Sequence, residues 1–120
     1  MIEDECTLPK FVYVGPHKYF VETSKKALLE KMVEQKNSGL MGHVSTGQAT
    51  IYINTDYAPT QQRDTLLHEV IHAIIYDTAL HLDWDSAREE EVVSRLTPAI
   101  LNVLRRNPEL VECLMENLEE

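Results

Sequence analysis

The sequence predicts a single α+β domain, residues 1–120, in which a small twisted, mainly antiparallel sheet packs against two long helices. Short β-rich segments fill the N-terminal half of the chain, and apolar stripes with helical spacing fill the C-terminal half. The length of 120 residues suits one domain with its own core. The hydrophobic fraction of 43% and the charged fraction of 26% are typical of a globular protein.

Two pairs of strands are expected. FVYV at 11–14 and KYFVE at 18–22 are rich in aromatic and β-branched residues and flank Gly15-Pro16-His17, which predicts a hairpin. GHVST at 42–46 and ATIYINT at 49–55 flank Gly47-Gln48 in the same way. In the last segment isoleucines alternate with polar residues, so one face of that strand is expected to be buried.

Helices are expected after each strand pair. Residues 23–36 carry apolar residues three and four apart, with Thr23 or Ser24 as the N-cap. A long helix is expected to start near Ala58-Pro59-Thr60, with Thr60 as its N-cap, and to run to about Leu80.

The C-terminal segment predicts one more long helix and a short one. Ser86-Ala87-Arg88-Glu89 has the form of a capping box and precedes a helical apolar stripe. Pro98 is expected either to kink this helix or to restart it with Thr97 as cap. Asn107-Pro108-Glu109 repeats that start signal for a final short helix.

Charge and cysteine usage exclude several classes of protein. The net charge of -9 argues against nucleic acid and anionic membranes as partners. Cys6 and Cys113 lie far apart and form no CxxC pair, so neither a disulfide framework nor a thiolate metal site is expected. The acidic start MIEDECTLPK is unlike a signal peptide, and no apolar run is long enough to span a bilayer, so we expect a soluble cytoplasmic protein.

One stretch, TLLHEVIHAII at 65–75, carries polar residues that a buried helix does not need. His68 and His72 are four residues apart, so both imidazoles project from one helix face and can share one metal ion, for which zinc is the natural choice. Glu69 lies about 100° around the helix, where a carboxylate can take a proton from an activated water. HEVIH is the HExxH motif of zincin metallopeptidases. The alternative is a pair of core histidines beside a surface glutamate.

A catalytic zinc site needs a third protein ligand. Metzincins have glycine and histidine where this chain has Ile75 and Thr78, which excludes that class. The gluzincin solution is a glutamate from a following helix, and the run 89–91 supplies three candidates.

Among these candidates we expect Glu90 to be the third ligand. Glu89 would be occupied at the helix start if it closed the capping box with Ser86, although it lies near the apolar face and stays the closest alternative. Glu91 points further from the core. The rival ligands in and near the connecting loop are more plausibly surface or capping residues: Asp77, His81, Asp83 and Asp85.

TLLHEVIHAI followed by EEEVVSRLTPAIL resembles the ImmA/IrrE family of small zinc metallopeptidases, especially the short versions common in phage and prophage genomes. The resemblance covers roughly residues 49–110. It implies a zincin-like fold with Zn²⁺, and its pattern of a glutamate three residues before an apolar residue again selects Glu90. Longer members have Ala-Asn and Phe-Ala where this chain has Val93-Ser94 and Leu96-Thr97, so repressor cleavage is not implied.

The expected function is a zinc-dependent endopeptidase of the cytoplasm, of the host cytoplasm if phage-encoded, with Glu69 as general base. By resemblance, the strand at 49–55 lies beside the active-site helix and offers its backbone to an extended peptide or protein substrate. Tyr57, Tyr76 and His43 are available as hydrogen-bond donors to a developing oxyanion, and the sequence does not rank them.

Two other functions stay open. The same ligands could bind zinc in a partner-binding or regulatory module without peptidase activity. A helical interaction protein without metal would instead dock through the acidic C-terminal helix, whose apolar stripe comprises Leu110, Val111, Leu114, Met115 and Leu118.

Overall fold

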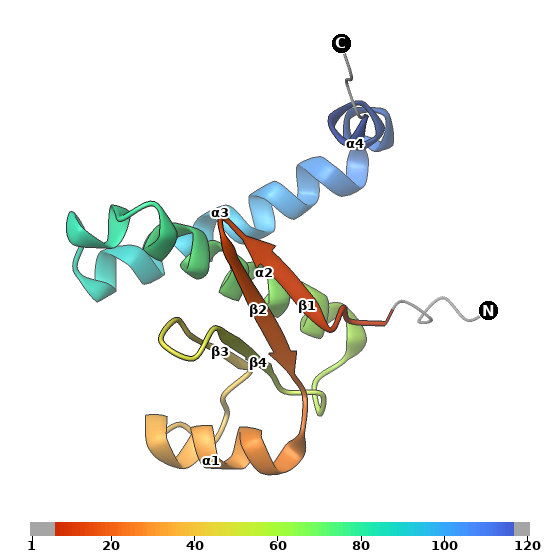
Figure 1. The fold of residues 1–120 in the computed structure, drawn as a ribbon. Coiled ribbons are helices and arrows are strands. Elements are labelled where there is room, and N and C mark those ends of the chain that lie inside the picture. Colours follow the sequence, from red (N-terminus) through yellow and green to blue (C-terminus); the bar gives the residue numbers. More distant parts are fainter. Residues whose placement is uncertain (1–6, 117–120) are drawn as a thin grey trace.

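The computed structural model describes residues 7–116 and shows a small mixed sheet with helices on both of its faces (Figure 1). The predicted α+β class is confirmed. In chain order the elements are β1 Phe11–Val14, β2 His17–Glu22, α1 Lys25–Gln35, β3 Gly42–Ser45, β4 Thr50–Ile53, α2 Pro59–Asp77, the 3₁₀ turn η2 Leu80–Leu82, α3 Ser86–Arg106 and α4 Pro108–Met115.

Both predicted strand pairs form, and within residues 7–116 they join into one sheet of order β1-β2-β4-β3. The pairs β1–β2 and β3–β4 are antiparallel, whereas β2 and β4 are parallel. The parallel pairing arises because α1 carries the chain away from the sheet between β2 and β3 and returns it beside the first hairpin. As a result β4 is paired on both sides, and β1 and β3 are the edge strands.

The main core lies between the sheet and α2. Ile51 and Ile53 of β4 are 0% exposed and form one cluster with Tyr19 and Val21 of β2 and Ala73 of α2. The intervening β4 residue points to the opposite face, where α1 lies. The predicted alternation along β4 is therefore confirmed, and it makes apolar the face of the sheet on which α2 packs.

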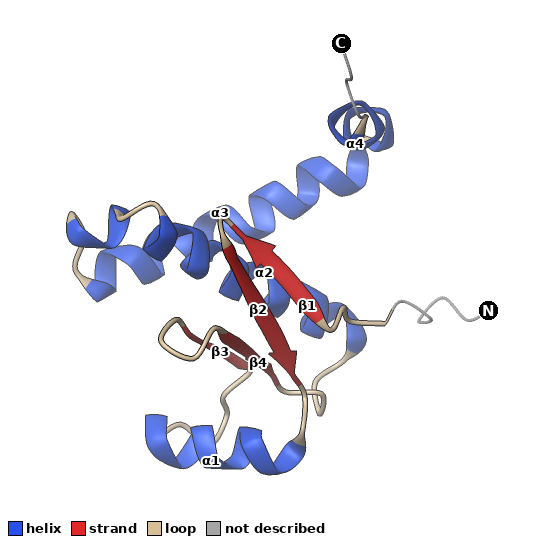
Figure 2. Ribbon diagram, viewed as in Figure 1, coloured by secondary structure: helices blue, strands red, loops and turns tan. Residues whose placement is uncertain are grey.

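A second apolar cluster joins α2 to α3. Val93 is 0% exposed and clusters with Ile71 and Ile75 of α2, with Leu67 and Trp84 packed at the margin. This contact holds the first half of α3 on α2. Figure 2 shows α4 at the far end of α3, away from the sheet.

The helix boundaries refine the predictions at three places. Ser24 caps α1 by accepting a hydrogen bond from the Ala27 N–H at 3.0 Å, as expected. The prediction of Thr60 as the N-cap of α2 is wrong: Ala58 is the cap residue and Pro59 takes the first helical position, which suits its fixed φ. The helix ends at Asp77 rather than Leu80, because Ala79 adopts the left-handed region at φ 64°.

The start of α3 differs from its prediction in a way that affects the site. Asp85 is the N-cap and its carboxylate accepts from the Arg88 N–H at 2.8 Å, so the predicted capping box between Ser86 and Glu89 is wrong. The side chain of Glu89 is thereby available for another contact. Pro98 lies inside α3 without ending it.

The predicted final short helix is confirmed within the described residues. Asn107 is the cap residue of α4, with Pro108 at the first helical position. Cys113 is an exposed free thiol, while Cys6 and Leu118 lie outside the described residues. Between residues 7 and 116, none of the helices combines the length and the apolarity that a bilayer crossing requires.

Replacing Ile53 by alanine should destabilise the protein by roughly 2 to 5 kcal/mol, because the deletion leaves a cavity between the sheet and α2. Urea denaturation followed by circular dichroism measures the change. Val33→Ala is the matched control, since Val33 is 78% exposed on α1 and should cost less than about 0.5 kcal/mol. Equal effects of the two substitutions would contradict this account of the core.

Candidate metal centre

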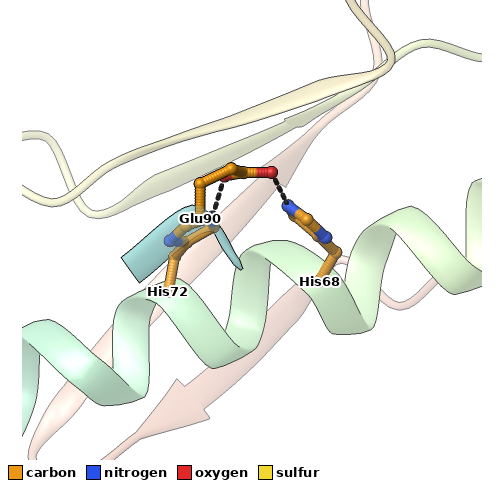
Figure 3. A group of neighbouring side chains, drawn as sticks. All are labelled: His68, His72 and Glu90. Atoms are coloured by element: carbon orange, nitrogen blue, oxygen red, sulfur yellow. Dashed lines mark hydrogen bonds and ion pairs between the residues drawn. The ribbon is translucent and has the colours of Figure 1, made fainter. Parts of the chain in front are cut away.

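His68 and His72 occupy the side of α2 that faces α3, and Glu90 of α3 lies between their rings (Figure 3). Glu90 Oε2 is 3.3 Å from His68 Nε2, and Glu90 Oε1 is 3.0 Å from His72 Nε2. The ring centroids are 5.0 Å apart. One ligand atom from each of these residues lies within 4.8 Å of the others, which is close enough for all three to hold one metal ion.

The donor set fits zinc. Two imidazole nitrogens and one carboxylate oxygen are a common catalytic zinc set, in which the fourth position is left to water or substrate. Burial lowers the pKa of His68, against the opposing effect of Glu90, so the ring is neutral at pH 7 and keeps a lone pair for a metal. Ser94, one turn after Glu90, donates from Oγ to Glu90 Oε2 at 3.0 Å and steadies that carboxylate.

Glu89, the closest alternative to Glu90, lies elsewhere. Its Oε2 is 2.6 Å from Nδ1 of His72, the ring nitrogen opposite the one that faces Glu90. Within the described residues the group able to hold a metal therefore contains Glu90 and not Glu89.

Glu69 is buried beside this cluster. It is 7% exposed, and its carboxylate has no hydrogen-bond partner among residues 7–116. Burial raises the pKa of Glu69 to about 7, with His72 opposing the rise and Glu90 adding to it. An acid at this depth is costly to a fold, and strongly shifted pKa values of this kind cluster at functional sites.

The cluster opens into a cavity of about 860 Å³ between β3, α2 and α3. Glu69, His68 and His72 line it together with Glu89 and Glu90 of α3. The apolar part of its wall includes Met41, Val44, Pro98 and Leu101. A concave site with a few convergent polar groups is the usual form of a substrate cleft.

The strand that borders this cavity is β3 rather than the segment at 49–55. The expectation that residues 49–55 offer free backbone groups is wrong, because β4 is paired with both β2 and β3. Gly42 begins β3 so close to α2 that a Cβ there would stand 2.5 Å from Thr65 Cγ2 and 3.4 Å from Glu69 Cγ. The edge of the sheet thus runs directly beside the cluster.

The three oxyanion-donor candidates separate in the structure. The Tyr57 hydroxyl donates to the Gly39 carbonyl at 2.9 Å and does not line the cavity. Tyr76 and His43 both line it. Burial, helped by the charge of Lys31, lowers the pKa of His43, so its ring is neutral at pH 7.

The rival ligands of the loop lie outside the metal cluster. His81 lines the cavity wall, where its ring stacks on Tyr76 with centroids 4.8 Å apart. Asp77 faces His17 of β2 at 3.9 Å, Asp85 caps α3, and Asp83 follows the 3₁₀ turn. The role of His81 in the cavity wall was missed from sequence, because helix spacing does not predict where a chain folds back after a helix end.

No protein-family model, curated protein or solved structure matches the chain.

The buried acid predicts a pH effect on the metal-free protein. Glu69 ionises at an ordinary pKa of 4.5 in the unfolded chain and at about 7 in the folded protein. As the pH rises between these values the unfolded state loses the proton first, so the free energy of unfolding should fall by up to about 3 kcal/mol. The stabilisation that protonated Glu69 contributes is fully present below the unfolded-state pKa of 4.5, and it is lost as the pH rises through the folded-state pKa of about 7.

Glu69→Gln removes this ionisation, so the stability of the variant relative to wild type should rise between about pH 5 and about pH 8. Urea denaturation in the presence of a chelator measures both proteins. Titrating groups that do not interact with Glu69 contribute equally to both proteins and cancel in the difference. Parallel pH profiles would contradict the raised pKa.

Proposed function

We propose that this protein is a zinc-dependent endopeptidase with a zincin-like, gluzincin-type site, similar to the ImmA/IrrE metallopeptidases. In this proposal His68, His72 and Glu90 hold Zn²⁺, and Glu69 is the general base. One observation carries it: the carboxylate of Glu90, from a separate helix, meets Nε2 of both motif histidines within 3.3 Å. The unpartnered carboxylate of Glu69 lines the same cavity.

The chain's own residues divide the chemistry between them. Zinc, when bound, would supply the positive charge that polarises a water and the scissile carbonyl. Glu69 takes the proton from the attacking water and later delivers it to the leaving amine. A pKa of about 7 suits this exchange, because the group can be either donor or acceptor near neutral pH.

A peptide substrate is supported by the edge strand β3. An extended peptide can pair with the free edge of β3 and so pass along the cavity beside the metal ligands. Met41, Val44, Pro98 and Leu101 would then contact its side chains. Tyr76 and His43 are the two lining residues able to donate a hydrogen bond to the oxyanion.

The metal centre is tested by metal content. Wild-type protein prepared without chelator should hold about one zinc per chain, and Glu90→Ala should lose most of it, because two histidines alone make a weak site. Inductively coupled plasma mass spectrometry gives the ratio.

Glu91→Ala is the matched control for zinc content. It removes the neighbouring carboxylate of the same helix, which faces Arg88 and Arg95 rather than the cavity, and should leave zinc unchanged. Full zinc retention by Glu90→Ala would contradict the assignment of this ligand.

The peptidase activity is tested with Glu69→Gln. This variant should keep its zinc but cleave at least about 100-fold more slowly, since a positioned general base contributes at least that factor. Incubation with a mixed peptide library and mass spectrometry of the products measures cleavage. Undiminished cleavage by the variant would contradict the role of Glu69. Zinc binding without cleavage by wild type would favour a regulatory zinc-binding module.

A further inference from the structure

Both nitrogens of the His72 ring have a carboxylate neighbour, and the two neighbours come from adjacent residues of α3. Nε2 faces Glu90 at 3.0 Å, on the side where a metal would lie, and Nδ1 faces Glu89 Oε2 at 2.6 Å. The side chains of His72 and Glu89 are 16% and 21% exposed, so this second contact is largely shielded from water. The metal site does not by itself require it.

The chemistry of imidazole makes the contact directional. An ionised carboxylate can only accept, so when Nε2 gives its lone pair to a metal, the single ring proton lies on Nδ1, which donates it to Glu89. Carboxylates in this position fix the tautomer and the orientation of a ligating ring and raise its basicity.

We propose that Glu89 is a positioning residue of the metal centre, whose carboxylate accepts the Nδ1 hydrogen bond of His72 and so presents Nε2 to the metal. This inference rests on the proposed zinc site. Glu89 contacts the metal only through His72, whereas Glu90 is a direct ligand. The two adjacent glutamates thus have different roles.

The local structure of α3 explains how Glu89 reaches the ring. Asp85 caps the helix, so the Glu89 side chain is not used at the cap. Its place in the first turn lies near the positive end of the helix dipole, which favours an ionised carboxylate. Val93, one turn later, is fully buried against Ile71 and Ile75 and fixes the position of this turn on α2.

The two histidines are not held equally. His68 has its contact with Glu90 through Nε2, and within residues 7–116 no acceptor faces its other ring nitrogen. His72 is therefore contacted through both ring nitrogens, and His68 through Nε2. A merely structural Glu89–His72 contact between α2 and α3 would affect folding stability, but it would not set which nitrogen binds the metal.

The test compares Glu89→Ala and Glu89→Gln with Glu91→Gln, which removes the same charge from the same turn but from an exposed side chain. Competition with a chromophoric chelator gives the zinc affinity. Thermal unfolding with excess chelator reports the stability of each metal-free variant. Long-range ¹H–¹⁵N NMR spectra of the zinc-loaded proteins show which nitrogen of His72 carries a proton.

We expect Glu89→Ala to weaken zinc binding by about 10- to 100-fold and Glu91→Gln to leave it unchanged. Glu89→Gln should fall between wild type and Glu89→Ala, because its amide oxygen still accepts the hydrogen bond without the charge. In zinc-loaded wild type, Nδ1 of His72 should be protonated and Nε2 metal-bound. If Glu89→Ala no longer folds, the zinc affinity of Glu89→Gln and the protonated nitrogen seen in the wild-type spectrum still test the positioning role of Glu89.

Three results would overturn the inference. Unchanged zinc affinity in a folded Glu89→Ala protein would show that Glu89 does not position the ligand, while leaving the zinc site intact. A loss as large as that of Glu90→Ala, or a metal on Nδ1 of His72, would make Glu89 a ligand instead. Wild-type protein that binds no zinc would overturn the proposed metal centre and, with it, this role.

Discussion

The packing of α3 against α2 is the contact on which the candidate site depends. Val93 is fully buried against Ile71 and Ile75, and this apolar cluster sets both the distance and the rotation between the two helices. Because Glu89 and Glu90 lie within one turn of Val93, they are brought to the histidines of α2. A small rotation of either helix would separate the carboxylates from the imidazoles, since residues four apart occupy one face only.

Helix α2 presents three different faces, and each one limits the others. Ala73 packs on the sheet and Ile71 packs on α3, and between these two directions His68, Glu69 and His72 face the cavity that lies between the sheet and α3. The apolar contacts on two sides hold the backbone in place, so the polar groups on the third cannot move to better-solvated positions. Burial of Glu69 without a partner is a consequence of this arrangement, and it places the raised pKa beside the candidate metal ligands.

The sheet supplies none of the candidate metal ligands, but it positions one wall of the cavity beside them. Because β4 pairs with β2 on one side and β3 on the other, the short strand β3 is left at the edge and borders the cavity. Gly42 lets that strand lie against Thr65 of α2, where any larger residue would meet the threonine methyl group. Within residues 7–116 the cavity therefore has an unpaired strand edge on one wall, and Glu89 and Glu90 of α3 on the other.

The sequence by itself determined the α+β class, the strand pairs, the helices and the histidine pair His68 and His72, because these follow from local periodicity and spacing. The choice of Glu90 over Glu89 rested on a family resemblance and on a capping box that does not form. The sequence did not determine the parallel pairing of β2 with β4 or the cap of α3, so it selected the wrong edge strand and an incorrect role for Glu89. Those features depend on contacts between segments far apart in the chain, which no local pattern encodes. Only the tertiary structure placed Glu89 beside Nδ1 of His72. Adjacent residues point about 100° apart around a helix axis, and the packing of α3 on α2 decides which side chain faces the ring.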